Sequence, residues 1–224
     1  MKSRSIDPWS KETDNTLKIV ALNCAGLKAH FHDIQTDDRL IKAHIIHLEE
    51  TSLIEAEDES AFTLDGYGQK FIKNGNGKGI ATYYDNEKVE PVEEIKTGKF
   101  QIAKFKHKVL GIINVYRSQS GNSLELLDHL KKQIEPGRTT IITGDFNICF
   151  MENFTNRMIQ GLLSLGFDQL VHEPTHIHGR HIDHVYFLDP SNRLKPMITR
   201  YSPYYSDHDG ICITIPEVTE IEKR

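Results

Sequence analysis

The chain has 224 residues, of which 38% are hydrophobic and 26% are charged, and its formal net charge is −5 at pH 7. This length and composition suit one domain with a full hydrophobic core and exclude a disordered or fibrous chain. No run of residues approaches the roughly 18 apolar positions of a membrane-spanning helix, so we expect no contact with a membrane. The three cysteines form neither a CxxC pair nor a disulfide pattern, which favours a reducing, intracellular location.

Short apolar runs predict that most of the ordered chain forms strands. We expect strands at residues 17–22, 45–48, 69–72, 79–84, 100–106, 109–116, 139–143, 182–188, 194–201 and 210–215. Apolar residues recur at helical spacing in 37–44, 123–134 and 156–165, and the last two of these segments end at Pro136-Gly137 and Gly166. Residues 1–16 are expected to form a flexible arm and residues 217–224 a polar tail, so that 17–216 make one domain.

Many strands with few helices between them predict an α/β fold. The strand spacing suits hairpins over much of the chain, and the sheets are therefore expected to be mixed or antiparallel. Two packed sheets with helices on their outer faces would bury the apolar face of every element.

Polar residues stand where several of these strands end. Asn23 and Glu50 follow two early strands, Asp145 and Asn147 follow a third, and Asp183 lies at the start of a later one. Asp207 and His208 directly precede the last strand. A single aspartate at such a place is most often a turn residue. A buried cluster of carboxylates, in contrast, requires a cation or protons.

The ordered set of motifs resembles the endonuclease/exonuclease/phosphatase superfamily, which includes pancreatic-type deoxyribonuclease, abasic-site endonucleases and the endonuclease domains of non-LTR retrotransposons. The matching segments are LNCAGL at 22–27, LEET at 48–51, NVYR at 114–117, GDFN at 144–147, HIDH at 181–184 and SDH at 206–208. They extend over nearly the whole chain. The resemblance implies a four-layered α/β sandwich and a phosphoesterase that depends on a divalent metal.

The resemblance also implies a role for each matching residue. The metal ligands would be Glu50, Asn23 and Asp207, with Mg²⁺ as the ion and Mn²⁺ as a substitute. Asp145 would orient or deprotonate the attacking water, and Asn147 would hold the phosphate or Asp145. Further roles would be phosphate contact by His208, orientation of its ring by Asp183, contact with the phosphate or the leaving group by Tyr116, and substrate binding by Asn114 and Arg117.

General chemistry agrees with these roles. Mg²⁺ binds oxygen ligands and uses only one or two carboxylates together with substrate phosphate. Hydrolysis of a phosphodiester needs a base for the water and positive charge near the phosphate oxygens. An Asp–His pair orients and charges an imidazole, as in other catalytic triads. The histidines at 172, 176, 178 and 181 lack the spacing of a structural zinc site and are expected to lie in a loop.

DNA is the expected substrate, although the net charge is negative. Four of the five excess negative charges belong to Glu50, Asp145, Asp183 and Asp207, so the remaining surface is close to neutral. The chain has no room for large recognition insertions and shows no amphipathic membrane helix. Its motifs are most similar to endonuclease domains of mobile elements, which implies a nuclear location and an origin in a longer polyprotein.

Other substrates of the same superfamily remain open. A phosphomonoesterase or lipid phosphodiesterase would act on inositol phosphates or sphingomyelin, and an abasic-site endonuclease would need an apolar wedge, for which only 150–151 and 204–205 are available. A binding module without activity is a third class, which the complete set of acidic residues disfavours. The sequence does not indicate the oligomeric state.

Overall fold

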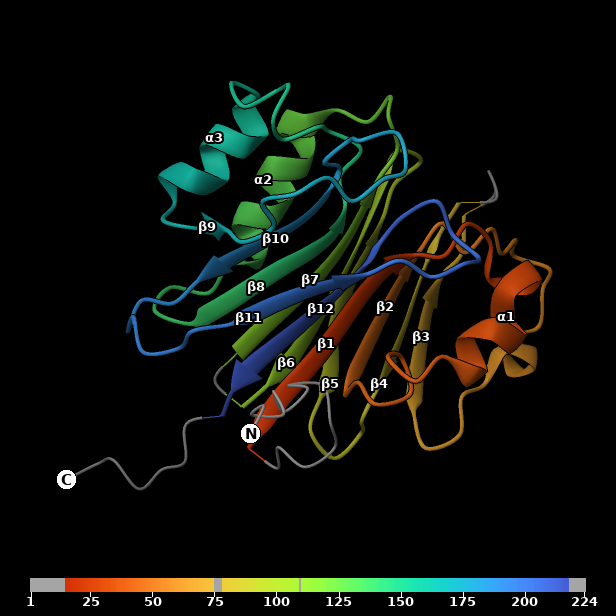
Figure 1. Ribbon diagram of the computed structural model, residues 1–224. Coiled ribbons are helices and arrows are strands. Elements are labelled where there is room, and N and C mark those ends of the chain that lie inside the picture. The colour runs from red at the N-terminus through yellow and green to blue at the C-terminus, as the bar shows by residue number, and fades with distance from the viewer. Residues whose placement is uncertain (1–14, 75–77, 109, 218–224) are drawn as a thin grey trace, which may run out of the picture.

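The computed structural model describes residues 15–74, 78–108 and 110–217. They form two six-stranded sheets packed face to face, with helices on both outer faces (Figure 1). None of the helices in the described part of the chain is long and apolar enough to cross a membrane. The expected four-layered sandwich of two mixed sheets and flanking helices is thus confirmed.

The first sheet joins strands from both ends of the chain. Its order is β11 (Met197–Tyr201), β12 (Gly210–Pro216), β1 (Thr16–Asn23), β2 (Ile45–Glu49), β4 (Ile80–Tyr84) and β3 (Gly68–Ile72). Strands β1 and β2 are parallel, whereas the other neighbours are antiparallel. The C-terminal ends of β1 and β2 therefore lie at the same edge as the N-terminal end of β12.

The second sheet is built from the middle of the chain. Its order is β5 (Glu90–Lys96), β6 (Phe100–His107), β7 (Leu110–Arg117), β8 (Thr139–Asp145), β10 (Asp183–Leu188) and β9 (Asp168–Gln169). The parallel pair is β7 and β8, and β10 runs antiparallel to β8 with Asp183 opposite Asp145. This register places the start of β10 beside the ends of β7 and β8.

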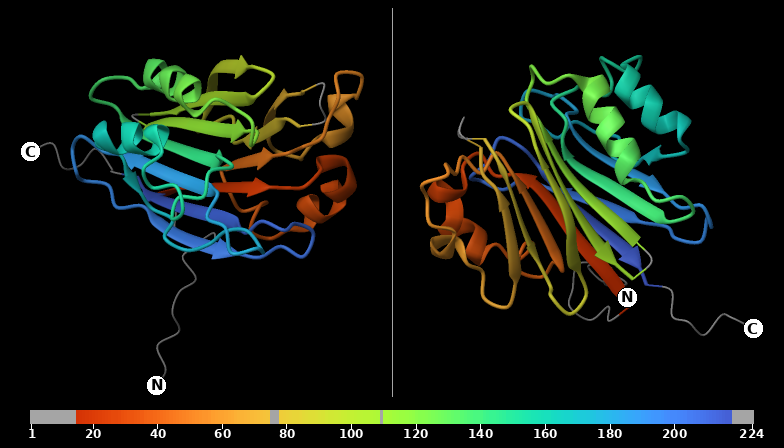
Figure 2. Two further views of the ribbon diagram at one scale, coloured as in Figure 1. Left: turned by 90° about the horizontal axis from the view of Figure 1, so that it is seen from above. Right: turned by 180° about the vertical axis from the view of Figure 1, so that it is seen from behind.

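Three apolar cores separate the four layers. Helix α1 (Leu27–Thr36) covers the outer face of the first sheet, and α2 (Ser123–Gln133) and α3 (Arg157–Ser164) cover the second (Figure 2). The third core lies between the two sheets. Asn122 and Asn156 cap α2 and α3 by accepting hydrogen bonds from the first free backbone N–H groups. A short 3₁₀ helix spans Glu59–Phe62.

The structure corrects four details of the sequence analysis. Residues 37–44 form turns, and the helix precedes them at Leu27–Thr36, where Leu27 and Ile34 pack on the sheet. Strand β5 was not predicted because most of its side chains are exposed at a sheet edge. The two-residue strand β9 was not predicted either. Glu217 is not part of a loose tail, since its carboxylate pairs with Lys88, His107 and Lys108. Most of the predicted arm and tail lies outside the described residues.

Candidate active site

The predicted site residues gather at one edge of the sandwich, where strands of both sheets end. Asn23 and Glu50 come from the ends of β1 and β2, and Asp145 ends β8. Asp183 starts β10, and His208 lies just before β12. Strand ends of two packed sheets place side chains with little freedom, as an active site requires.

Asp145 is buried at the centre of this group. Its Oδ2 accepts hydrogen bonds from Nδ2 of Asn23 and Nδ2 of Asn147, both at 3.0 Å, and its Oδ1 accepts one from the Asn147 backbone N–H at 2.8 Å. Burial and the nearby charge of Asp183 raise the pKa of Asp145 to about 7. A carboxylate with such a pKa can accept a proton from water near neutral pH.

The glycine before Asp145 permits the close packing of β7 and β8. Gly144 has φ +133°, and a Cβ there would lie 1.9 Å from the carbonyl oxygen of Val115. A side chain would therefore push apart the two parallel strands that end at the site. This explains the glycine of the GDFN motif by geometry.

Asp183 and His208 form a buried ion pair. Nδ1 of His208 lies 2.9 Å from Oδ2 of Asp183, and the Thr175 hydroxyl donates to the same oxygen at 2.5 Å. Burial by itself lowers the pKa of His208, but Asp183, with smaller effects of Asp145 and Asp207, raises it to about 9. The imidazole is therefore protonated at neutral pH, and its Nε2–H is available to an anion.

Glu50 lies at the solvent-exposed opening of this group of side chains, which we call the mouth of the site. Its backbone has a left-handed conformation, with φ 51°. Its Oε1 accepts hydrogen bonds from the Tyr116 hydroxyl at 2.9 Å and the Lys78 ammonium at 2.7 Å. Burial and the charge of Glu50 raise the pKa of Tyr116 above its ordinary value, so the phenol stays protonated. A partly exposed carboxylate that already attracts a cation suits a metal ligand.

The neighbouring Glu49 is a residue that the sequence analysis missed. It points into the space between the sheets, where burial and the charges of Asp183 and Asp145 hold its pKa well above the usual range. Its carboxyl group therefore holds a proton more strongly than an ordinary glutamate does. The sequence contained a signal for this difference. Successive residues of a strand point to opposite faces of the sheet, so the adjacent residues Glu49 and Glu50 are not expected to share one environment.

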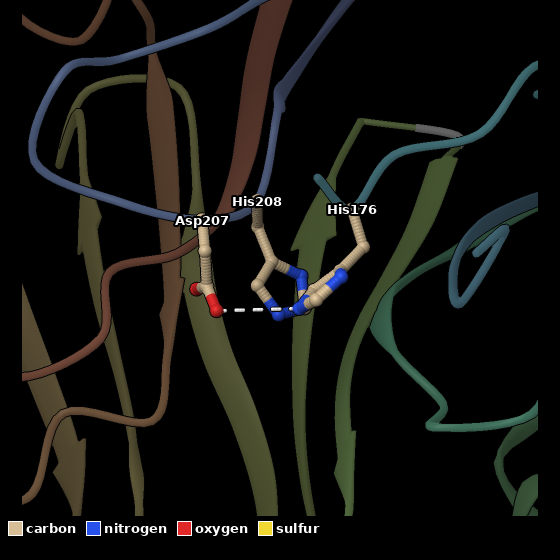
Figure 3. A group of neighbouring side chains, drawn as sticks. All are labelled: His176, Asp207 and His208. Atoms are coloured by element: carbon tan, nitrogen blue, oxygen red, sulfur yellow. Dashed lines mark ion pairs between the residues drawn. The ribbon is translucent and has the colours of Figure 1, made fainter. Parts of the chain in front are cut away.

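His176 is a second residue that the analysis did not place at the site. Figure 3 shows it beside Asp207 and His208. An antiparallel bridge joins the backbones of His176 and His208, and Nε2 of His176 lies 3.2 Å from Oδ2 of Asp207. The His178 backbone N–H donates to Nδ1 of His176, which leaves Nε2 to donate to Asp207. Only the tertiary structure brings these loops together.

The three potential ligand atoms of His176, Asp207 and His208 lie within 4.8 Å of one another, as do those of Asp145, Asp183 and His208. The carboxylates of these groups are the ligands that a cation can use, because His208 is protonated and its Nδ1 is paired with Asp183. The Ser206 hydroxyl donates to the backbone carbonyl of Asn23 at 2.6 Å and so holds the loop of Asp207 against the end of β1.

Asn114 and Arg117 do not have the surroundings that substrate binding requires. Asn114 is buried between the sheets beside Glu49. The Arg117 guanidinium is also buried and donates to the backbone carbonyls of Phe146 and Gly121. Its alternating position in β7 turns it away from Tyr116, so it supports the loop that carries Asn147 instead of reaching the mouth.

No protein-family model matches this sequence, and no curated protein matches it either. Several solved structures, in contrast, match the structure of this chain. An AP endonuclease from Archaeoglobus fulgidus is 17% identical with a TM-score of 0.68, and the match covers 88% of this chain and 98% of that one. The endonuclease domain of TRAS1, a telomere-specific non-LTR retrotransposon, is 16% identical with a TM-score of 0.66, over 90% and 98% of the two chains.

A third solved structure carries a family description. It is an endonuclease/exonuclease/phosphatase family protein from Bacteroides thetaiotaomicron, 15% identical with a TM-score of 0.62, and the match covers 92% of this chain and 96% of that one. At such identities the likeness concerns the fold, and the coverage shows that the fold is shared over most of this chain.

Proposed function

Because the chain has the fold of the endonuclease/exonuclease/phosphatase superfamily, we propose that it is a divalent-metal-dependent phosphodiesterase that nicks DNA. The observation that carries this proposal is the geometry of the mouth. A buried carboxylate with a pKa near neutrality, Asp145, lies beside the protonated imidazole of the Asp183–His208 pair. These two groups supply a base for water and a cation for a phosphate.

The residues at the mouth fit Mg²⁺, with Mn²⁺ as a substitute. Glu50 offers a partly exposed carboxylate that holds the ammonium of Lys78, and so a place where positive charge is favoured. Asn23 and Asp207 would be the further oxygen ligands, and the Ser206 hydroxyl holds the loop of Asp207 against Asn23. One or two carboxylates with substrate phosphate are the usual set for Mg²⁺. When bound, the ion would supply positive charge to the oxygens of the reacting phosphate.

The side chains divide the remaining chemistry between them. Asp145 accepts a proton from the attacking water. Asn147 and Asn23 donate hydrogen bonds to the Asp145 carboxylate and so fix its orientation toward that water. His208 donates through Nε2 to a phosphate oxygen, and Asp183 keeps the ring charged and fixed. The water attacks phosphorus opposite the 3′ oxygen, the bond to that oxygen breaks, and the departing oxygen takes up a proton from solvent, so the products are a 3′-hydroxyl and a 5′-phosphate.

A covalent intermediate is not part of this proposal. Tyr116 is the hydroxyl nucleophile among the predicted site residues, but its hydroxyl donates to Glu50 and its raised pKa makes the phenolate rare at neutral pH. Direct attack by water leaves ends that a polymerase can extend and a ligase can join. A DNA polymerase can use such a 3′-hydroxyl as a primer, which suits a nuclease of mobile-element origin.

DNA is favoured as substrate by the likeness to an AP endonuclease and to a retrotransposon endonuclease domain. An abasic-site preference has a specific observation in its favour, since Met151 and Tyr204 are large side chains with 70% and 85% exposure close in sequence to the site motifs. Either side chain could enter an unstacked duplex, so an abasic duplex belongs in the test.

The experiment is a nicking assay on supercoiled plasmid with Mg²⁺, run beside hydrolysis of an abasic duplex, an inositol phosphate and sphingomyelin. We expect nicked plasmid whose ends are extended by DNA polymerase and sealed by ligase without kinase or phosphatase treatment. Cleavage of only the inositol phosphate or sphingomyelin, a 3′-phosphate end, or protein attached through Tyr116 would each refute the proposal.

Glu50→Gln tests the metal ligand in the same assay. It preserves the shape of the side chain but removes the negative charge, so divalent-dependent nicking should be lost while the fold persists. Glu135→Gln is the matched control, because Glu135 also pairs with a lysine, Lys104 at 2.8 Å, but far from the mouth. Wild-type nicking by Glu50→Gln would show that the ligand assignment is wrong.

A further inference from the structure

A polar cavity of about 200 Å³ lies directly beside the candidate active site. Lys78 and Tyr116 line the side of the cavity that faces Glu50, and both donate hydrogen bonds to that carboxylate. Much of the remaining lining comes from Lys99, Gln101, Ser118 and Ser120. None of the described residues that line it is acidic. The cavity therefore offers hydroxyl, amide and ammonium donors to an anion.

Gln101 is the feature of this cavity that calls for a ligand. Its side chain is fully buried on β6 opposite Tyr116 of β7, and neither its Oε1 nor its Nε2 has a hydrogen-bond partner among the described residues. The Ser118 hydroxyl, which also lines the cavity, is likewise without a partner in the described part of the chain. Buried polar groups of this kind are costly unless a ligand or water bonds to them.

The charges beside the cavity match a phosphate group. The Lys99 ammonium lies 2.9 Å from the Ser120 hydroxyl. The Lys78 ammonium is within 5.7 Å of the centre of the Tyr116 ring while it pairs with Glu50. Lysine and serine side chains are common partners of backbone phosphates in protein–DNA complexes.

We propose that this cavity binds a second phosphate of the substrate strand, next to the phosphate that is cleaved. Lys99, Ser118 and Ser120 bind its oxygens, and the Gln101 amide bonds to the same phosphate or its sugar. Tyr116 and Lys78 separate the two sites, so a strand that places one phosphate near Glu50 can place its neighbour in the cavity. The proposal rests on the proposed function, since it takes a nucleic-acid strand as the ligand.

The first test measures binding without catalysis. Wild type and Lys99→Gln are titrated with a labelled DNA duplex in EDTA at several salt concentrations, and fluorescence anisotropy gives the binding constant. Loss of one phosphate contact should reduce the slope of log K against log salt by about 0.9. Lys106→Gln is the matched control, because Lys106 is similarly exposed at the opposite end of β6 and should keep the wild-type slope.

Equal slopes for wild type and Lys99→Gln would overturn the subsite. A free anion is the other source of the same chemistry, and inorganic phosphate distinguishes it. Phosphate binding that Lys99→Gln abolishes, together with unchanged DNA slopes, would assign the cavity to a free anion and overturn the proposal for a strand.

The second test compares substrates with one phosphate and with many. Bis(p-nitrophenyl) phosphate has a single phosphate and cannot fill the subsite, whereas an oligonucleotide can. Lys99→Gln and Gln101→Leu should lower kcat/KM for the oligonucleotide about tenfold more than for the small diester, because a charge-assisted hydrogen bond is lost only in the first case. Equal losses on both substrates would refute the subsite. If wild type hydrolyses neither, the proposed function fails while the salt slopes still test the cavity.

Discussion

Replacing Asp183 with asparagine should remove a pH-dependent part of the stability of the metal-free protein. His208 has a pKa of about 9 in the folded state, against 6.5 for an ordinary histidine. A basic group whose pKa is raised by folding stabilises the fold fully below its unfolded pKa, and this contribution disappears as the pH rises through the folded value. The difference of about 2.5 pH units corresponds to about 3 kcal/mol of unfolding free energy, lost between about pH 6.5 and 9.

The assay is urea unfolding in EDTA at a series of pH values. In wild type the unfolding free energy should decline across this window, and in Asp183→Asn the decline in its upper part should be much smaller, because His208 has lost the charge that raises its pKa most. The upper part of the window is the most informative, since Asp145, with a pKa of about 7, is mostly ionised there. Asp33→Asn is the control, because Asp33 pairs with His30 on the surface at 3.4 Å. Parallel curves for wild type and Asp183→Asn would refute the reasoning.

Three further predictions test separate features. Lys78→Gln should tighten Mg²⁺ binding several-fold in calorimetry, because the ammonium competes for its glutamate partner at 2.7 Å, and unchanged or weaker binding would contradict this. His208→Ala should lower the nicking rate by about 10²-fold or more. The double variant His208→Ala/Asp183→Asn should be no slower than the slower single variant, because the pair acts as a unit. Additive losses would show that the two side chains act independently. Gly144→Ala should destabilise the fold by more than about 2 kcal/mol in urea unfolding, because its Cβ would overlap a backbone oxygen, while Gly98→Ala, with open space around it, should change stability by less than about 0.5 kcal/mol.

Much of the fold could be predicted because its signals are local. The buried strands, such as Thr139–Asp145 and Gly210–Pro216, are short apolar runs bounded by polar residues. Helix α2 has a cap, an apolar face and a Pro-Gly stop within one segment. The exposed edge strand Glu90–Lys96 lacks such a pattern, because its stability comes from pairing with β6 and not from its own side chains.

The sequence by itself determined which residues could carry the chemistry, since Glu50, Asp145, Asp183 and His208 stand at strand ends in an order that resembles one superfamily. The tertiary structure decided how they are used. A left-handed turn separates Glu50 at the mouth from Glu49 in the interior. The pairing of β10 with β8 puts Asp183 next to Asp145.

The structure places His176 at the site and Arg117 outside it, and both differences from the sequence analysis have the same reason. The Arg117 guanidinium donates to the backbone carbonyl of Phe146 in the loop after β8, and a bridge between two loops brings His176 to Asp207. These placements depend on contacts between segments about 30 residues or more apart in the chain. No local pattern encodes such contacts, because they result from the packing of whole sheets and loops. Residue types and strand ends, in contrast, can be recognised within each short segment of the sequence.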